Sequence, residues 1–118
     1  MDFNISKQEE LFLQMIREFT ENEIKPIAAE IDEQERFPVE TVEKMGKLGI
    51  MGIPIPVEYG GQGSTNQIYS MAVEEISRVC GTTGVVVSAH TSLCADPIMN
   101  FGTEEQKQKY LPKLASGE

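Results

Sequence analysis

The stretch that decides the fold is GTTGVVVSAHTSLCADPI, residues 81–98. Three consecutive valines are typical of a strand, but no Gly or Pro interrupts residues 85–94, and about ten residues exceed the usual strand length. The continuation also fails to alternate apolar with polar side chains, so the stretch is predicted to be a helix. Because it carries no charge before Asp96, we expect an interior helix whose faces meet protein or an apolar ligand.

The same stretch holds the only histidine, His90, and one of two cysteines, Cys94, four residues apart and hence on one helix face. A catalytic Cys–His pair needs an orienting third group and an oxyanion pocket, and the sequence identifies neither. A metal site needs three or four ligands, and the chain has one His and two Cys in all. The pattern therefore favours Cys94 as a small core residue and His90 at a helix edge or an interface.

Helix signals surround this stretch on both sides. Ser6 with Glu9, and Thr103 with Gln106, form capping boxes that predict helix starts. Apolar side chains at helical spacing predict two amphipathic helices, one after Ser6 and one that opens at Ser64 or Thr65. The apolar residues are Phe12, Met15, Ile16, Phe19, Ile24, Ile27, Ala28 and Ile31 in the first, then Ile68, Met71, Ala72 and Ile76 in the second.

Three prolines and one aspartate mark expected breaks in the helices. Pro26 should kink or restart the first helix, and Pro38 suits the first position of the second. Asp96 should cap a short turn, and Pro112 should end the last helix.

An irregular segment, GIMGIPIPVEYGGQG, covers residues 49–63. Its glycines lack the spacing of a dinucleotide-binding loop and no strand precedes them, so a surface loop is favoured over a phosphate cradle. No convincing pair of strands remains anywhere in the chain. The sequence thus predicts one domain, residues 1–118, with an all-α orthogonal or up-down bundle of about five to six helices.

Composition restricts the class of function. A net charge of −9 disfavours nucleic acid and anionic membrane surfaces as partners. No run of about 18 apolar residues and no secretory signal is present, which favours a cytoplasmic protein without membrane contact. Cys80 and Cys94 are accordingly expected to be free thiols.

Three segments carry a resemblance to a known family: FPVETVEKMGKLGIMGIPIPVEYGGQG, AVEEISRVCGTTGVVVSAHTSL and PIMNFGTEEQKQKYLPKLASGE. They resemble the N-terminal domain of acyl-CoA dehydrogenases of the short-chain, butyryl-CoA type, over essentially the whole chain. The resemblance implies a homotetrameric parent with a helical N-terminal domain, a β-domain and a C-terminal four-helix bundle, and with FAD between the last two. It also implies α,β-dehydrogenation of acyl-CoA by a glutamate base and flavin, which passes electrons to an electron-transfer flavoprotein.

The chain stops at SGE, residues 116–118, where this family would enter the β-domain. The resemblance therefore assigns no catalytic base, no cofactor-binding residue and no metal ligand here; Glu74, Glu75 and Glu118 do not occupy the place of the base. We expect an excised domain that neither binds flavin firmly nor turns over alone.

The resemblance places one wall of the acyl-chain cavity on the helix of residues 85–95, at Val86, Val87, His90 and Leu93. An apolar tail needs a wall without unpaired charge, because a buried charge is costly. The branched valines favour short, C4-like acyl groups, whereas His90 departs from the apolar or amide residue typical of that place.

The resemblance also implies an apolar hollow that receives a side chain of the electron-transfer flavoprotein. The matching positions are Phe12, Phe19, Ile50 and Ala72, with Glu23 as an acidic rim. An equally good interpretation is that Phe12 and Phe19 are ordinary core residues on a helical stripe.

Two alternatives to this assignment remain open at the level of sequence. The chain could be a free-standing helical interaction module that keeps the docking surface without the chemistry. It could also be the corresponding domain of a related acyl-CoA oxidase or a branched-chain acyl-CoA dehydrogenase.

Overall fold

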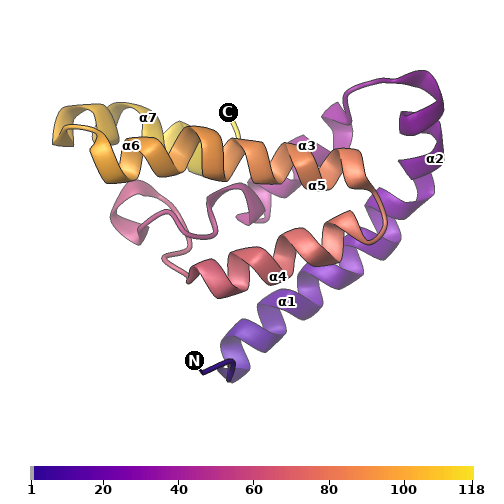
Figure 1. The fold of residues 1–118 in the computed structure, drawn as a ribbon, viewed down its shortest axis with the longest axis horizontal. Coiled ribbons are helices and arrows are strands. Elements are labelled where there is room, and N and C mark those ends of the chain that lie inside the picture. The colour runs from indigo at the N-terminus through magenta and orange to yellow at the C-terminus, as the bar shows by residue number, and fades with distance from the viewer. Residues whose placement is uncertain (1) are drawn as a thin grey trace.

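The structure, a computed structural model, describes residues 2–118, and that range contains helices and no strand. The predicted all-α class is therefore confirmed. Seven α-helices join into five continuous rods (Figure 1). The α-helices are α1 (Lys7–Phe19), α2 (Lys25–Gln34), α3 (Val39–Lys47), α4 (Asn66–Ser77), α5 (Gly81–Ser88), α6 (Asp96–Phe101) and α7 (Glu104–Ser116). None of the helices in residues 2–118 has both the length and the apolar character needed to cross a bilayer.

Shorter helical segments complete the rods and the loop. The π-helix η1 (Thr20–Ile24) joins α1 to α2, and the π-helix η4 (Ala89–Ala95) joins α5 to α6. Two 3₁₀ turns, η2 (Ile50–Gly52) and η3 (Val57–Tyr59), lie in the irregular segment between α3 and α4.

The long rod α5–η4–α6 lies beside α7 on one side of the molecule, and α1 crosses α4 on the other (Figure 1). Two hydrophobic clusters hold these rods together. The first gathers α1, α4 and α5 around Ile16, Ile76 and Val87, all fully buried. The second joins η3, η4 and α7 through Ile55, Tyr59, Ala95, Leu111 and Ala115. The rod that contains residues 85–95 therefore contributes to both cores.

Most predicted helix ends are confirmed. Both capping boxes are formed, at Ser6 and at Thr103. The α-helix restarts at Lys25 next to Pro26, after the π-turn η1. Pro38 was predicted to be the first residue of its helix. It is instead the N-cap of α3, so the helix begins one residue later, at Val39.

Two predicted breaks are wrong. Asp96 is not a cap, because it has helical angles (φ −62°, ψ −45°) within a continuous rod. Pro112 does not end the last helix, which continues to Ser116 and ends at Gly117 in the left-handed region (φ 78°). A proline inside a helix costs about 3 kcal/mol, but its neighbours Leu111 and Ala115 are both buried in the second cluster. Tertiary packing thus outweighs the local preference.

Candidate functional site

The helix of residues 85–95 stands close to α4 because of a glycine. Gly84 is buried inside α5, and a Cβ there would lie 1.9 Å from Ser77 Oγ and 3.1 Å from Ser77 Cα. A larger residue would therefore push α5 away from α4. The predicted helix over residues 85–94 is confirmed, although its second half is a π-helix of seven residues rather than an α-helix.

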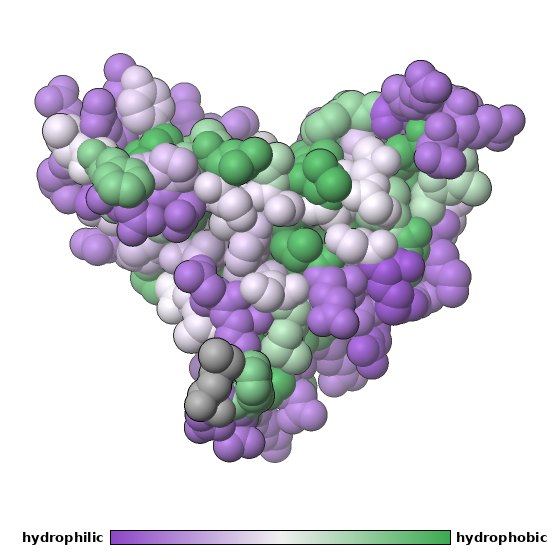
Figure 2. All heavy atoms as spheres, in the orientation of Figure 1, coloured by the Kyte–Doolittle hydropathy of each residue, from purple (hydrophilic) through white to green (hydrophobic). Residues whose placement is uncertain are grey.

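This helix is interior on one side only. Val87, Thr91 and Ala95 are buried at spacings of four and contact the core. Val85 is 66% exposed and Leu93 is 77% exposed, with half-buried Ala89 between them. Residues 85, 89 and 93 share one helix face, and this open stripe carries no charge. Figure 2 shows hydrophobic side chains gathered along the same rod at the upper edge of the molecule.

The four expected wall residues divide between two faces. Val86 is half-buried and Leu93 is exposed, so both border the open side of the helix. Val87 is 0% exposed within the first cluster, so its side chain faces the core and not the open side. Val85 lies on the open stripe and was not among the expected residues. Periodicity in the sequence does not identify it, because the π-helix from Ala89 to Ala95 changes the spacing between Val85 and Leu93.

His90 lies at a helix interface, as predicted. Its Nε2 is 2.9 Å from the carbonyl oxygen of Leu114 near the end of α7. That carbonyl belongs to the last turn of α7, where oxygens lack the usual partner four residues on. It accepts from the Gly117 amide at 3.3 Å, and a second hydrogen bond from Nε2 ties η4 to α7. Cys94, predicted to be a small core residue, is instead exposed and unpaired.

The expected docking residues lie mostly in the core. Phe19 is 8% exposed, and Ile50 and Ala72 are fully buried in the first cluster. Phe12 is half-buried against the same cluster. Glu23 is half-buried and forms an ion pair with Lys44 of α3. In this domain Phe12 is thus the one apolar member of the set with a substantial exposed surface.

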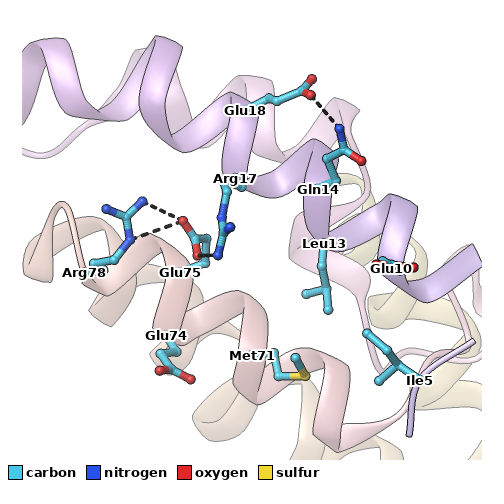
Figure 3. A pocket seen from close by; sticks show the side chains of 10 residues that line it. All are labelled: Ile5, Glu10, Leu13, Gln14, Arg17, Glu18, Met71, Glu74, Glu75 and Arg78. Carbon is cyan, nitrogen blue, oxygen red and sulfur yellow. Dashed lines mark hydrogen bonds and ion pairs between the residues drawn. The ribbon is translucent and has the colours of Figure 1, made fainter. Parts of the chain in front are cut away.

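A groove of about 800 Å³ runs between α1 and α4 (Figure 3). Its apolar side chains are Ile5, Leu13 and Met71, which point into the space between the two helices. The remaining lining is polar or charged: Glu10, Gln14, Arg17, Glu18, Glu74, Glu75 and Arg78. Phe12 does not line the groove. The pair α1 and α4 therefore presents two distinct surfaces, one with Leu13 and one with Phe12.

Ion pairs close one end of the groove. Glu75 accepts hydrogen bonds from Arg78 at 2.6 Å and from Arg17 at 3.1 Å. These bonds, Arg78 first, lower the pKa of Glu75. Arg78 also reaches Glu21 in η1 at 2.6 Å, and Lys25 and Arg78 together lower the pKa of Glu21 to about 2. These ion pairs form a network that fastens α4 to α1 and η1.

Comparison with known proteins identifies the family. The family model "Acyl-CoA dehydrogenase, N-terminal domain" matches residues 6–118. The chain belongs to the acyl-CoA dehydrogenase family. It is 66% identical over 118 residues to the short-chain specific acyl-CoA dehydrogenase of Clostridium acetobutylicum, and these residues are 31% of that relative.

Solved structures of the acyl-CoA dehydrogenase family share the fold. The butyryl-CoA dehydrogenase of Megasphaera elsdenii superposes with a TM-score of 0.90 at 36% identity, over 99% of this chain and 31% of that chain. A chain from work on the electron transferring flavoprotein of Acidaminococcus fermentans superposes with a TM-score of 0.92 at 45% identity, again over 99% and 31%. The chain thus spans about a third of the length of the acyl-CoA dehydrogenases that it matches.

The amides of the glycine loop are used within the loop itself. The amides of Gly61, Gln62, Gly63 and Ser64 donate to the carbonyls of Pro56, Gly52, Ile55 and Ile53, respectively. A Cβ at Gly61 would lie 2.0 Å from the Ile55 oxygen, so this glycine serves the loop's own packing. No amide of this set is left to cradle a phosphate. The segment is a loop whose exposed part follows Pro56, whereas Ile50, Met51, Ile53 and Ile55 are buried in the two clusters. Within residues 2–118, no group of three or more His, Cys, Asp or Glu residues could hold a metal ion.

Proposed function

We propose that this domain forms one wall of the acyl-chain site of an FAD-dependent acyl-CoA dehydrogenase that acts on short-chain acyl-CoA. The observation that carries the proposal is the open stripe of Val85, Ala89 and Leu93. An exposed, uncharged helix face is costly in water, and a hydrocarbon tail covers it without leaving a polar group unpaired. The similarity to short-chain and butyryl-CoA dehydrogenases supports the substrate class.

The residues of this chain contribute shape rather than proton transfer. Val85, Val86 and Leu93 would border the tail, and His90 would stand at the edge, held by the Leu114 carbonyl. In a site of this kind, one methylene accepted or excluded changes discrimination by about 1–3 kcal/mol. Side chains that are branched at Cβ, such as Val85 and Val86, are stiff and resist displacement by a longer tail.

The wall assignment is tested in the complete dehydrogenase that carries this domain. Leu93→Ala should raise kcat/KM for hexanoyl-CoA relative to butyryl-CoA about tenfold, because the truncation leaves room for additional methylenes. Val87→Ala is the matched control, since its side chain lies in the core. It should lower the melting temperature and leave the chain-length ratio unchanged. If Leu93→Ala leaves the ratio of kcat/KM for hexanoyl-CoA over butyryl-CoA unchanged, this face of the helix does not border the acyl chain.

We further propose that an electron-transfer flavoprotein docks on the side of α1 that carries half-buried Phe12, with Glu23 on the rim. A partly exposed aromatic side chain with a polar rim around the surface is typical of a transient interface. Phe19, Ile50 and Ala72 would support Phe12 from the core beneath it. The similarity to a chain from work on an electron transferring flavoprotein supports this partner.

The docking proposal has a matched pair of variants on α1. Phe12→Ala should slow reoxidation of the reduced enzyme by the flavoprotein about tenfold, without slowing reduction by butyryl-CoA. Leu13→Ala, one residue along on the groove side, should change neither step. If Leu13→Ala slows reoxidation and Phe12→Ala does not, the partner docks in the groove instead.

A further inference from the structure

Tyr69 of α4 forms hydrogen bonds to the neighbouring rod α5–η4, which carries the open stripe. Its half-buried ring packs against the first core cluster. Its hydroxyl lies 2.8 Å from Ser92 Oγ and 3.3 Å from the carbonyl oxygen of Ser88. The Tyr69 hydroxyl can donate to the Ser88 carbonyl oxygen while it accepts from the Ser92 hydroxyl.

The two contacts fall on either side of the junction between α5 and η4. Ser88 is the last residue of α5, and Ser92 is in the middle of the seven-residue π-helix. The two serines are four positions apart, so they form a row along one face. Each lies one position before a residue of the open stripe, because Ala89 follows Ser88 and Leu93 follows Ser92. Tyr69 therefore holds Ser88 and Ser92, which lie next to the open stripe.

A π-helix needs such outside support. The π-conformation is rare, usually lasts a single turn, and often occurs at functional sites. Here it sets the rotation of Leu93 relative to Val85, because a change to α-helical spacing would turn every later side chain to another direction. On the opposite flank, His90 fixes the same segment to Leu114 of α7. Tyr69 of α4 and the Leu114 carbonyl of α7, the latter through His90, thus hold η4 from two different rods.

We propose that Tyr69 is a positioning residue for the acyl-chain wall. It fixes the rotation and depth of the open stripe through Ser88 and Ser92, and thereby sets the length of acyl chain that the site accepts. This inference rests on the proposed function of the stripe. Tyr69 acts through the backbone and side chains of η4, so no contact between its hydroxyl and the substrate is required.

The test uses the complete dehydrogenase and three single substitutions. Tyr69→Phe keeps the ring in the core and removes only the hydroxyl. It should raise the ratio of kcat/KM for hexanoyl-CoA over butyryl-CoA about three- to tenfold, with KM for butyryl-CoA rising more than kcat changes. Ser92→Ala removes the partner and should shift the ratio in the same direction. Tyr110→Phe is the matched control, because Tyr110 is 46% exposed on α7.

A double variant separates positioning from general loss of stability. Tyr69→Phe with Ser92→Ala should shift the ratio no further than the larger single change, since both remove one hydrogen bond. A ratio equal to wild type in Tyr69→Phe, or one matched by Tyr110→Phe, would overturn the inference. If Leu93→Ala shifts the ratio and Tyr69→Phe does not, only the role of Tyr69 fails. If neither shifts it, the wall assignment fails with it.

Discussion

The π-helices η1 and η4 both connect two α-helices into one rod, but their side chains differ in charge and exposure. Each is followed two residues later by a proline, Pro26 or Pro97, and each joins two α-helices into one rod. The first, TENEI, is charged, and Glu21 in it pairs with Lys25 and Arg78. The second, AHTSLCA, has no acidic or permanently charged residue and exposes Leu93 and Cys94. The first therefore joins elements of the fold through ion pairs, whereas the second leaves an apolar surface exposed.

The hydroxyls of the two segments show the same contrast. Thr20 is buried in the first π-helix and donates to the carbonyl of Ile16 at 2.8 Å. Thr91 is buried in the second, and its Oγ1 has no hydrogen-bond partner within the described chain. A buried polar group without a partner lowers stability, so Thr91 destabilises the second segment whereas Thr20 stabilises the first.

The largest expected effect comes from truncating one apolar residue in each π-helix. Ile24 is 0% exposed and Leu93 is 77% exposed. Ile24→Ala should lower the free energy of unfolding by about 3 kcal/mol, because a cavity opens in the first core. Leu93→Ala should change it by less than about 0.5 kcal/mol. Urea unfolding of the 118-residue chain measures both free energies. Equal losses of stability in the two variants would contradict the difference in burial between the two π-helices.

A smaller effect of opposite sign is expected at the two threonines. Thr91→Val removes an unpaired hydroxyl and keeps the shape, so it should stabilise the chain by about 1 kcal/mol. Thr20→Val loses a formed hydrogen bond and should cost about 1 kcal/mol. Thermal unfolding of the two variants beside wild type compares them directly. Destabilisation by Thr91→Val would mean that its hydroxyl has a partner, such as a buried water.

The smallest effect concerns pH and is confined to the first π-helix. Glu21 has its pKa lowered from 4.5 to about 2, so the stabilisation from its pairs is complete above about pH 4.5 and is lost as the pH falls toward 2. Glu21→Gln should therefore lower the melting temperature slightly at pH 7 and have no effect near pH 2. Glu43→Gln, at an exposed carboxylate of α3, should be neutral at pH 7. A Glu21→Gln penalty that persists at pH 2 would contradict the ion-pair explanation.

Sequence patterns predicted the features that depend on neighbours within one turn. The capping boxes at Ser6 and Thr103 and the helical period around Ile16 and Ile76 require only local contacts, and the structure confirms them. The prediction failed at Pro112, where burial of Leu111 and Ala115 carries the helix past a residue that usually ends one.

The sequence predicted that the candidate site is a helix, but not which of its side chains are exposed. The absence of charge in residues 85–95 indicated contact with protein or an apolar ligand; one face is buried against the core, and the other is exposed and uncharged. Which valine faces which side was not available from periodicity, because the π-helix changes the spacing partway along. Val87 was thus expected on the open wall and lies in the core, whereas Val85 was missed.

The sequence alone determined the all-α class, the position of most helix ends and the family, because these follow from local hydrogen bonding and from the order of residues. Only the tertiary structure decided which face of residues 85–95 stays open, that Phe19, Ile50 and Ala72 are core, and that Tyr69 and Leu114 hold η4 from two sides. These outcomes depend on contacts between rods far apart in the chain. Such contacts also override local preferences, as at Pro112, and stabilise a π-helix that local sequence does not specify.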